Sequence, residues 1–325
     1  MKILKFVLTA TLIVFMATSA SFAKKNATFE AWAEGDKAYK KVWFGPGPSQ
    51  LKHMDPSKHP KRVGLISVYV YDTGNFKFSA LAATYGGSYF ETFGMNARGA
   101  NMFATEFAQR SESVLKARFA EHGMELLTPV EFLETEEQTQ AYLNFRLPES
   151  GMQKFAKGMR SFFEKNPHAD GAADGYAMIP THLWIDKEML TTLDELRVTL
   201  GLDALAVVTN LTSSNKKSVI FAGASLAIYG PNPEPRPEEK YAKYWWPALV
   251  YVGGTFGKGF KGIEFAYWSK DKDSTKSVTN PVSGNTTTYR GSGIERAEFA
   301  GYEGIIDALA RKTLEEMDKR FRKGK

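Results

Sequence analysis

The sequence predicts an α/β (α+β) fold, a mixed sheet with helices packed on it, a β-rich second half and a closing C-terminal helix. Three observations predict it. Apolar, β-branched runs at residues 62–72 and 204–211 are separated by amphipathic helical patterns. Strand patterns then follow one another from residue 218 to 268, and the chain closes with helical periodicity over residues 298–322.

The first 23 residues have the three parts of a secretory signal peptide. Two lysines lie in Met1–Lys5, an apolar core follows at Phe6–Met16, and small residues fill Thr18–Ala23. The pattern predicts cleavage before Lys24. The alternative is an uncleaved anchor, but a spanning helix needs roughly 20 apolar residues. We therefore expect a periplasmic or secreted protein, with no membrane span after cleavage.

Composition excludes several classes of protein. Residues 24–325 carry a formal charge of +4, too small an excess to favour nucleic acid as a partner. Cysteine is absent, which excludes disulfide scaffolds, thiol catalysis and thiolate metal sites. A hydrophobic content of 43% with 24% charged residues is typical of a globular domain held by its core.

The mature chain is expected to begin with an extended N-terminal arm. Residues 24–61 are polar, contain scattered aromatic residues and are interrupted by prolines from Pro46 onwards, so the pattern favours an irregular segment packed on the body. Arg62–Asp72 then has the composition of a buried strand. We place a single domain at 62–325.

The first half of this domain alternates helices and strands. Residues 73–98 form a long Gly- and aromatic-rich connection, predicted to be a loop insertion. A helix is expected at 99–122 and a short strand at Met124–Leu127. Thr128-Pro129-Val130-Glu131 is a helix-start signature, and this helix should run to about Phe145.

A second insertion is predicted at 146–185, with a short amphipathic helix over 152–163. A helix at 186–200 should end at Gly201 and lead into a strand at Ala204–Leu211.

Five further predictions cover the second half. Strands are expected at Ser218–Tyr229, Pro247–Phe256 and Lys261–Trp268, and residues 269–292 should form an exposed hairpin or a long loop. The final helix spans Glu298–Arg322 and turns a stripe that includes Ile305, Leu309 and Leu314 inward.

This order of elements resembles a known periplasmic module. The resemblance is carried by the strand Arg62–Tyr71, the helix end Phe119-Ala120-Glu121-His122-Gly123, the step Leu200-Gly201-Leu202-Asp203-Ala204-Leu205, the strand pair after it and the last helix. It is similar to the module of the curli-secretion protein family, the amino-terminal domain of TolB and lipoprotein activators of peptidoglycan synthesis. The resemblance implies a non-enzymatic cell-envelope role in assembly, secretion or regulation, through protein binding or oligomerisation.

Motifs for catalysis and cofactors are weak. Gly253–Gly259 is one residue short of a phosphate-binding loop, so a glycine-rich hairpin turn is the better interpretation. No histidine has a paired metal-ligand spacing, and neither Ser88 nor Ser225 has the hydrolase elbow sequence. We therefore predict no catalytic residues, no metal and no cofactor.

Aromatic residues beside the Pro-rich corner at 231–237 are the best candidate for a binding surface, because Tyr and Trp dominate interface hot spots. Packing in the core is the more common use of such residues, and the sequence leaves both open. The candidate partner-binding residues, with those of the aromatic connection, are Tyr241, Tyr244, Trp245, Trp246, Tyr85, Tyr89 and Phe90. The alternative function is a periplasmic hydrolase or carbohydrate-binding protein that uses this Tyr/Trp cluster.

The chain ends in a basic tail. Lys319, Arg320, Arg322, Lys323 and Lys325 follow Asp318 without an acidic residue between them. The tail can bind anionic lipid head groups or an acidic partner. More often such a tail favours the negative end of the last helix dipole and keeps that end solvated, and this is the interpretation we favour.

Overall fold

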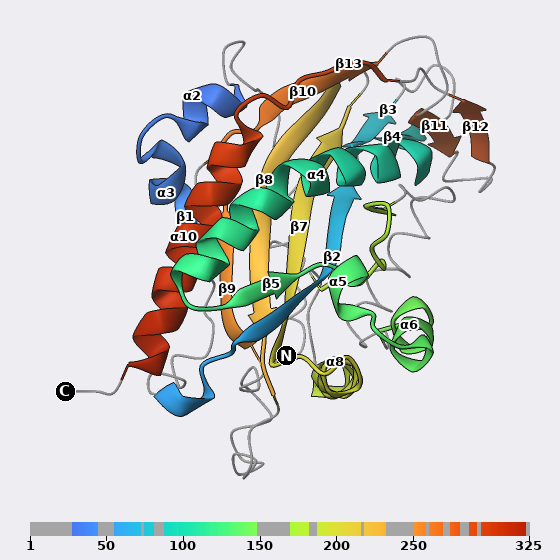
Figure 1. The fold of residues 1–325 in the computed structure, drawn as a ribbon. Helices are drawn as coiled ribbons and strands as arrows, with labels where there is room; N and C mark the ends of the chain where they lie inside the picture. Colours follow the sequence, from blue (N-terminus) through green and yellow to red (C-terminus); the bar gives the residue numbers. More distant parts are fainter. Residues whose placement is uncertain are drawn as a thin grey trace, which may run out of the picture.

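The structure is a computed structural model, and the residues it describes are 28–44, 55–72, 75–80, 88–95, 97–147, 170–181, 187–215, 218–231, 250–257, 260–268, 274–279, 286–290 and 294–322. They form a mixed sheet with helices on both faces, which confirms the predicted fold class (Figure 1).

A nine-stranded sheet forms the centre. Its main path is β1-β9-β8-β7-β2-β5, and β6, β10 and β13 are attached to it. The strands are β1 Val42–Phe44, β2 Arg62–Asp72, β5 Glu125–Leu127, β6 Gly171–Ala172, β7 Ala204–Ser214, β8 Ser218–Tyr229, β9 Val250–Phe256, β10 Ile263–Trp268 and β13 Ile294–Ala297. β2 runs parallel to β5 and β7, whereas β7, β8 and β9 are antiparallel neighbours. The most apolar runs of the sequence are β2 and β7, and they lie side by side. Parallel strands that are covered on both faces are typically apolar along their whole length.

Each face of the sheet carries its own core. Helices α4 (Ala97–Glu121) and α10 (Tyr302–Phe321) cover one face, where their aromatic and aliphatic side chains meet inward residues of β2, β7 and β8. Helices α5 (Pro129–Phe132), α6 (Glu136–Leu143) and α8 (Lys187–Thr199) cover part of the other face around Ile66 and Tyr69. The inward stripe predicted for α10, which includes Ile305, Leu309 and Leu314, is buried.

The segment before β2 differs from the prediction of an irregular arm. Residues 28–44 form α2 (Phe29–Ala33), α3 (Lys37–Lys41) and strand β1, and a 3-10 turn, η1 (Pro56–Lys58), follows. Thr28 caps α2 through its hydroxyl, which accepts from the Ala31 amide at 3.1 Å. The side chain of Phe29 is buried against Phe221 and Tyr302, so tertiary burial decides a conformation that composition did not predict.

A second, four-stranded sheet is built from two distant hairpins, in the order β12-β11-β4-β3. Strands β3 (Asn75–Ala80) and β4 (Ser88–Met95) replace the predicted loop at 73–98. Strands β11 (Ser274–Thr279) and β12 (Thr286–Arg290) confirm the hairpin alternative for residues 269–292. Pairing of β4 with β11 gives each hairpin the partner that an isolated hairpin lacks.

One further prediction is wrong. The helix expected from Thr128 to about Phe145 is two helices, α5 and α6, because Thr135 accepts from the Gln138 amide and starts a second capping box. Gly253 and Gly254 lie inside β9, within the strand predicted at Pro247–Phe256, and the chain turns after Phe256, where the Phe260 amide donates to the Gly257 carbonyl. A Cβ at Gly254 would overlap Thr313 of α10, so glycine here permits close packing of helix on strand.

Only part of the second predicted insertion is described. Residues 170–181 cross the sheet edge, and β6 pairs antiparallel with β2. The amphipathic helix predicted at 152–163 and the signal peptide lie outside the described residues. Among the residues described, no helix is both long and apolar enough to cross a membrane.

Candidate functional site

Helix α4 presents a polar face beside the sheet. Its inner side is fixed by the buried side chains Phe103, Phe107, Leu115 and Phe119. The residues between them at helical spacing therefore face outward. With Asp174, they line an open trough: Arg98, Asn101, Met102, Thr105, Glu106 and Gln109.

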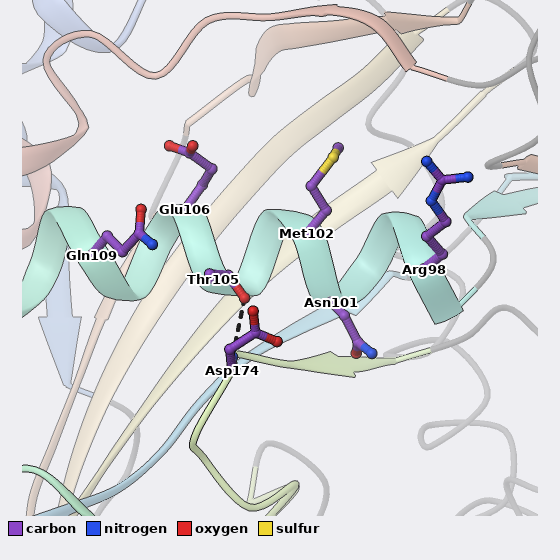
Figure 2. Close-up of a pocket in the computed structure, with 7 residues that line it drawn as sticks. All are labelled: Arg98, Asn101, Met102, Thr105, Glu106, Gln109 and Asp174. Atoms are coloured by element: carbon purple, nitrogen blue, oxygen red, sulfur yellow. Dashed lines mark hydrogen bonds between the residues drawn. The ribbon is translucent and has the colours of Figure 1, made fainter. Parts of the chain in front are cut away.

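The other wall of the trough is the segment around β6. Gly171 lies so close to α4 that a Cβ would overlap the backbone of Ala100 and Asn101. Three residues later, the amide of Asp174 donates a hydrogen bond to the Thr105 hydroxyl at 3.0 Å (Figure 2). A glycine and one hydrogen bond thus set how closely this wall approaches the helix.

Two tyrosines, the half-buried Tyr176 and the buried Tyr142, hold this wall in place through hydrogen bonds. The hydroxyl of Tyr176 donates to Glu112 of α4 at 2.8 Å. The hydroxyl of Tyr142 donates to the Ile66 carbonyl at 2.7 Å and accepts from the Ala177 amide at 2.8 Å. Burial raises the pKa of both phenols well above the usual range, so both stay neutral donors at physiological pH. The wall is therefore held at several points.

The open trough has a volume of about 620 Å³. Its lining carries positive charge at Arg98 and negative charge at Glu106 and Asp174. Arg98 lies near the start of α4, and Glu106 lies about two turns further along, 3.4 Å from Arg110. Figure 2 shows Met102 and Glu106 extending from one side of the helix, while Asn101 and Thr105 extend toward the β6 wall. Met102 is a large apolar side chain with 41% of its surface exposed.

The trough holds two carboxylates, Glu106 of α4 and Asp174 of the β6 segment. In Figure 2, Glu106 extends from the side of α4 opposite the β6 segment, whereas the Asp174 carboxylate points toward the helix. Hydrolysis of a glycosidic bond needs two carboxylates that face each other across the scissile bond. Within the described ranges, no group of three or more His, Cys, Asp or Glu side chains is arranged to hold a metal ion.

The predicted binding residues are not brought into this trough by the part of the chain that is described. Tyr241, Tyr244, Trp245, Trp246 and Tyr85 lie outside the described residues. Tyr89 and Phe90 belong to strand β4, where Phe90 is the register partner of Phe78 in β3 and of Thr279 in β11.

Comparison with known proteins identifies no relative. No family model, no curated protein and no solved structure matches the chain. The function must therefore be argued from the fold and from the trough.

The trough residues were missed at the sequence level. A polar face on an amphipathic helix is the ordinary solvated side, and nothing local distinguishes Asn101 or Gln109. The second wall comes from residues about 70 positions later. The one available signal was the small pair Gly171-Ala172, which is compatible with close packing against a helix.

Proposed function

We propose that this chain is an exported, non-enzymatic cell-envelope protein that acts by protein binding. In this proposal the trough on α4 holds an extended segment of the partner. The observation that carries it is the lining of the trough: two amides, one exposed thioether and charges of both signs on a single rigid helix.

The lining favours a peptide over a small molecule. Pockets for small ligands enclose most of the ligand surface, whereas this trough is open along the helix. The side chains of Asn101 and Gln109 each offer a donor and an acceptor, which matches the peptide group of an extended chain. Met102 adapts its shape to varied apolar side chains.

Export is supported by the signal-peptide pattern of residues 1–23, and an envelope role by the resemblance in the order of elements. The alternative, a hydrolase or carbohydrate-binding protein, depends on Tyr241 and its neighbours, outside the described residues. In the trough itself, Glu106 and Asp174 lie on opposite sides of α4 in Figure 2, which gives a hydrolase no support.

Site-specific photo-cross-linking in the native envelope tests the proposal. A photoreactive phenylalanine derivative replaces Met102, and a matched variant carries it at Val198, an apolar residue of α8 with 63% of its surface exposed. We expect a discrete cross-linked protein from position 102 and none from position 198. The mature chain recovered from the same fraction should begin at Lys24.

Equal cross-linking at the two positions would contradict a specific trough. An adduct that is a carbohydrate and not a protein would support the alternative function.

A further inference from the structure

A second surface lies where three segments meet at the C-terminal end of α10. His59, next to η1, contacts Asp318 of α10 through Nε2 at 3.2 Å, and its ring packs on Phe321 at 4.9 Å between centroids. His122, just after α4, contacts the other oxygen of Asp318 at 2.8 Å. Residues far apart in sequence are thus held at one end of the molecule, where η1 lies near the end of α10 in Figure 1.

These contacts gather exposed cations at the same end. Lys58 and Lys61 flank His59, and Lys319 and Arg322 flank Phe321. We call these four residues the basic end. All four are exposed. Among the described residues, Lys58, Lys61 and Arg322 form no ion pair, and Lys319 has only a 3.6 Å contact with Glu316.

The nearby acids are already engaged for the most part. Asp318 lies between the two histidines, and Glu316 contacts both Lys319 and Arg320. Arg320 is turned inward and donates to the Tyr251 carbonyl at 2.7 Å, so it does not add to the surface charge. Asp203 accepts from the amides of Lys61 and Arg62 at 2.8 and 2.9 Å, and Asp55 accepts from the Ser57 amide at 2.9 Å. With Glu125, which is exposed beside Lys61, these are the exposed acids nearest to Lys58 and Lys61.

We propose that the basic end docks the protein on an anionic lipid surface. Flexible cations without fixed partners at one end of a rigid body are complementary to a layer of anionic head groups. The four residues of the basic end are all charged and include no apolar side chain that could insert among the lipid tails. The protein should therefore bind the lipid surface reversibly, and salt should weaken the binding. This surface is separate from the trough on α4, and the proposal does not depend on the proposed function.

Vesicle co-sedimentation of the mature chain tests the inference. The probes are vesicles of phosphatidylcholine alone and vesicles with about 30% phosphatidylglycerol. We expect binding to the anionic vesicles only, and loss of binding at about 0.5 M salt, where charges are screened over a few ångströms.

A matched pair of double variants locates the surface. Each cation near an anionic membrane contributes about fivefold to partitioning, so K58A/R322A should bind about 25-fold more weakly. The control K40A/K261A removes the same charge from exposed lysines on α3 and before β10. It should bind as the wild type does, and circular dichroism checks that both variants are folded.

Three outcomes would overturn the inference. They are equal binding to both kinds of vesicle, an equal loss in the control variant, and binding to a polyglutamate peptide without binding to vesicles. The last result would assign the basic end to an acidic protein.

Discussion

At the residue scale, Asp72 joins the two sheets. Its side chain is fully buried at the end of β2, and one carboxylate oxygen accepts from the Ser214 amide at 2.9 Å. The other accepts from the Ser214 hydroxyl at 2.7 Å and from the amide of Met95, the last residue of β4, at 2.9 Å. One carboxylate therefore links β2, β7 and the hairpin of the second sheet.

We predict that D72A lowers the free energy of unfolding by about 3 kcal/mol, because it leaves several buried donors without an acceptor. S214A removes one hydroxyl and should cost only about 1 kcal/mol. Urea denaturation of both variants measures the difference. A cost for D72A no larger than that of S214A would show that the carboxylate does not link the sheets.

Glu131 contributes a pH dependence. A hydrogen bond from Lys116 and one from the Thr128 amide lower the pKa of this carboxyl to about 2. A carboxyl whose pKa is lower in the folded than in the unfolded chain stabilises the fold above its unfolded value near 4.5, and this is lost as the pH falls toward 2.

We expect E131Q to be less stable than the wild type by about 0.5–1 kcal/mol near neutral pH, a small value because 41% of the Glu131 side chain is exposed. The two proteins should converge as the pH falls from about 5 to 2. Urea unfolding across that range measures this convergence. A constant difference at every pH would contradict it.

At the scale of elements, α10 fastens the N-terminal segment. The ammonium of Lys312 donates to the carbonyls of Tyr39 and Val42, at 3.1 and 2.6 Å, and lies 4.9 Å from the centre of the Tyr39 ring. Tyr39 also donates from its hydroxyl to Glu315 at 2.5 Å. These bonds satisfy carbonyls at the end of α3 and the start of β1.

K312A should release this segment without unfolding the domain. We predict at least about tenfold faster amide hydrogen exchange in residues 37–44, since each bond lost to a charged donor is worth about 1.5–3 kcal/mol. Mass spectrometry of exchanged peptides measures it, with K319A, an exposed lysine of the same helix, as the control. Unchanged exchange in 37–44 would show that β1 pairing alone holds the segment.

The strongly patterned elements were predicted close to their bounds. Ser218–Tyr229 matches β8 residue for residue, and α4, α8 and β10 differ from prediction by two residues or fewer at each end. In these elements the hydrophobic residues recur at the spacing that places them on one buried face. This spacing can be read from the sequence alone. Residues 29–44 and the strands β3 and β4 were missed because partners distant in the chain stabilise them. The partners are α10 and β9 for residues 29–44, and β11 for the β3-β4 pair.

At the scale of the whole molecule, tertiary structure creates both proposed surfaces. The trough exists because the β6 segment crosses beside α4, and the basic end exists because His59 and His122 meet Asp318. None of these pairs is local in sequence. The trough and the basic end are built on different parts of α4 and α10, so each can be altered while the other stays intact.

The sequence by itself determined the fold class, the inward face of α10, and the need for a large core in a chain without cysteine. These follow from periodicity and composition, which are local properties. Only the tertiary structure decided the second sheet, the ordered segment before β2, the α4 trough and the basic end. Each of them depends on contacts between distant segments, whose free energy appears only when both partners are in place.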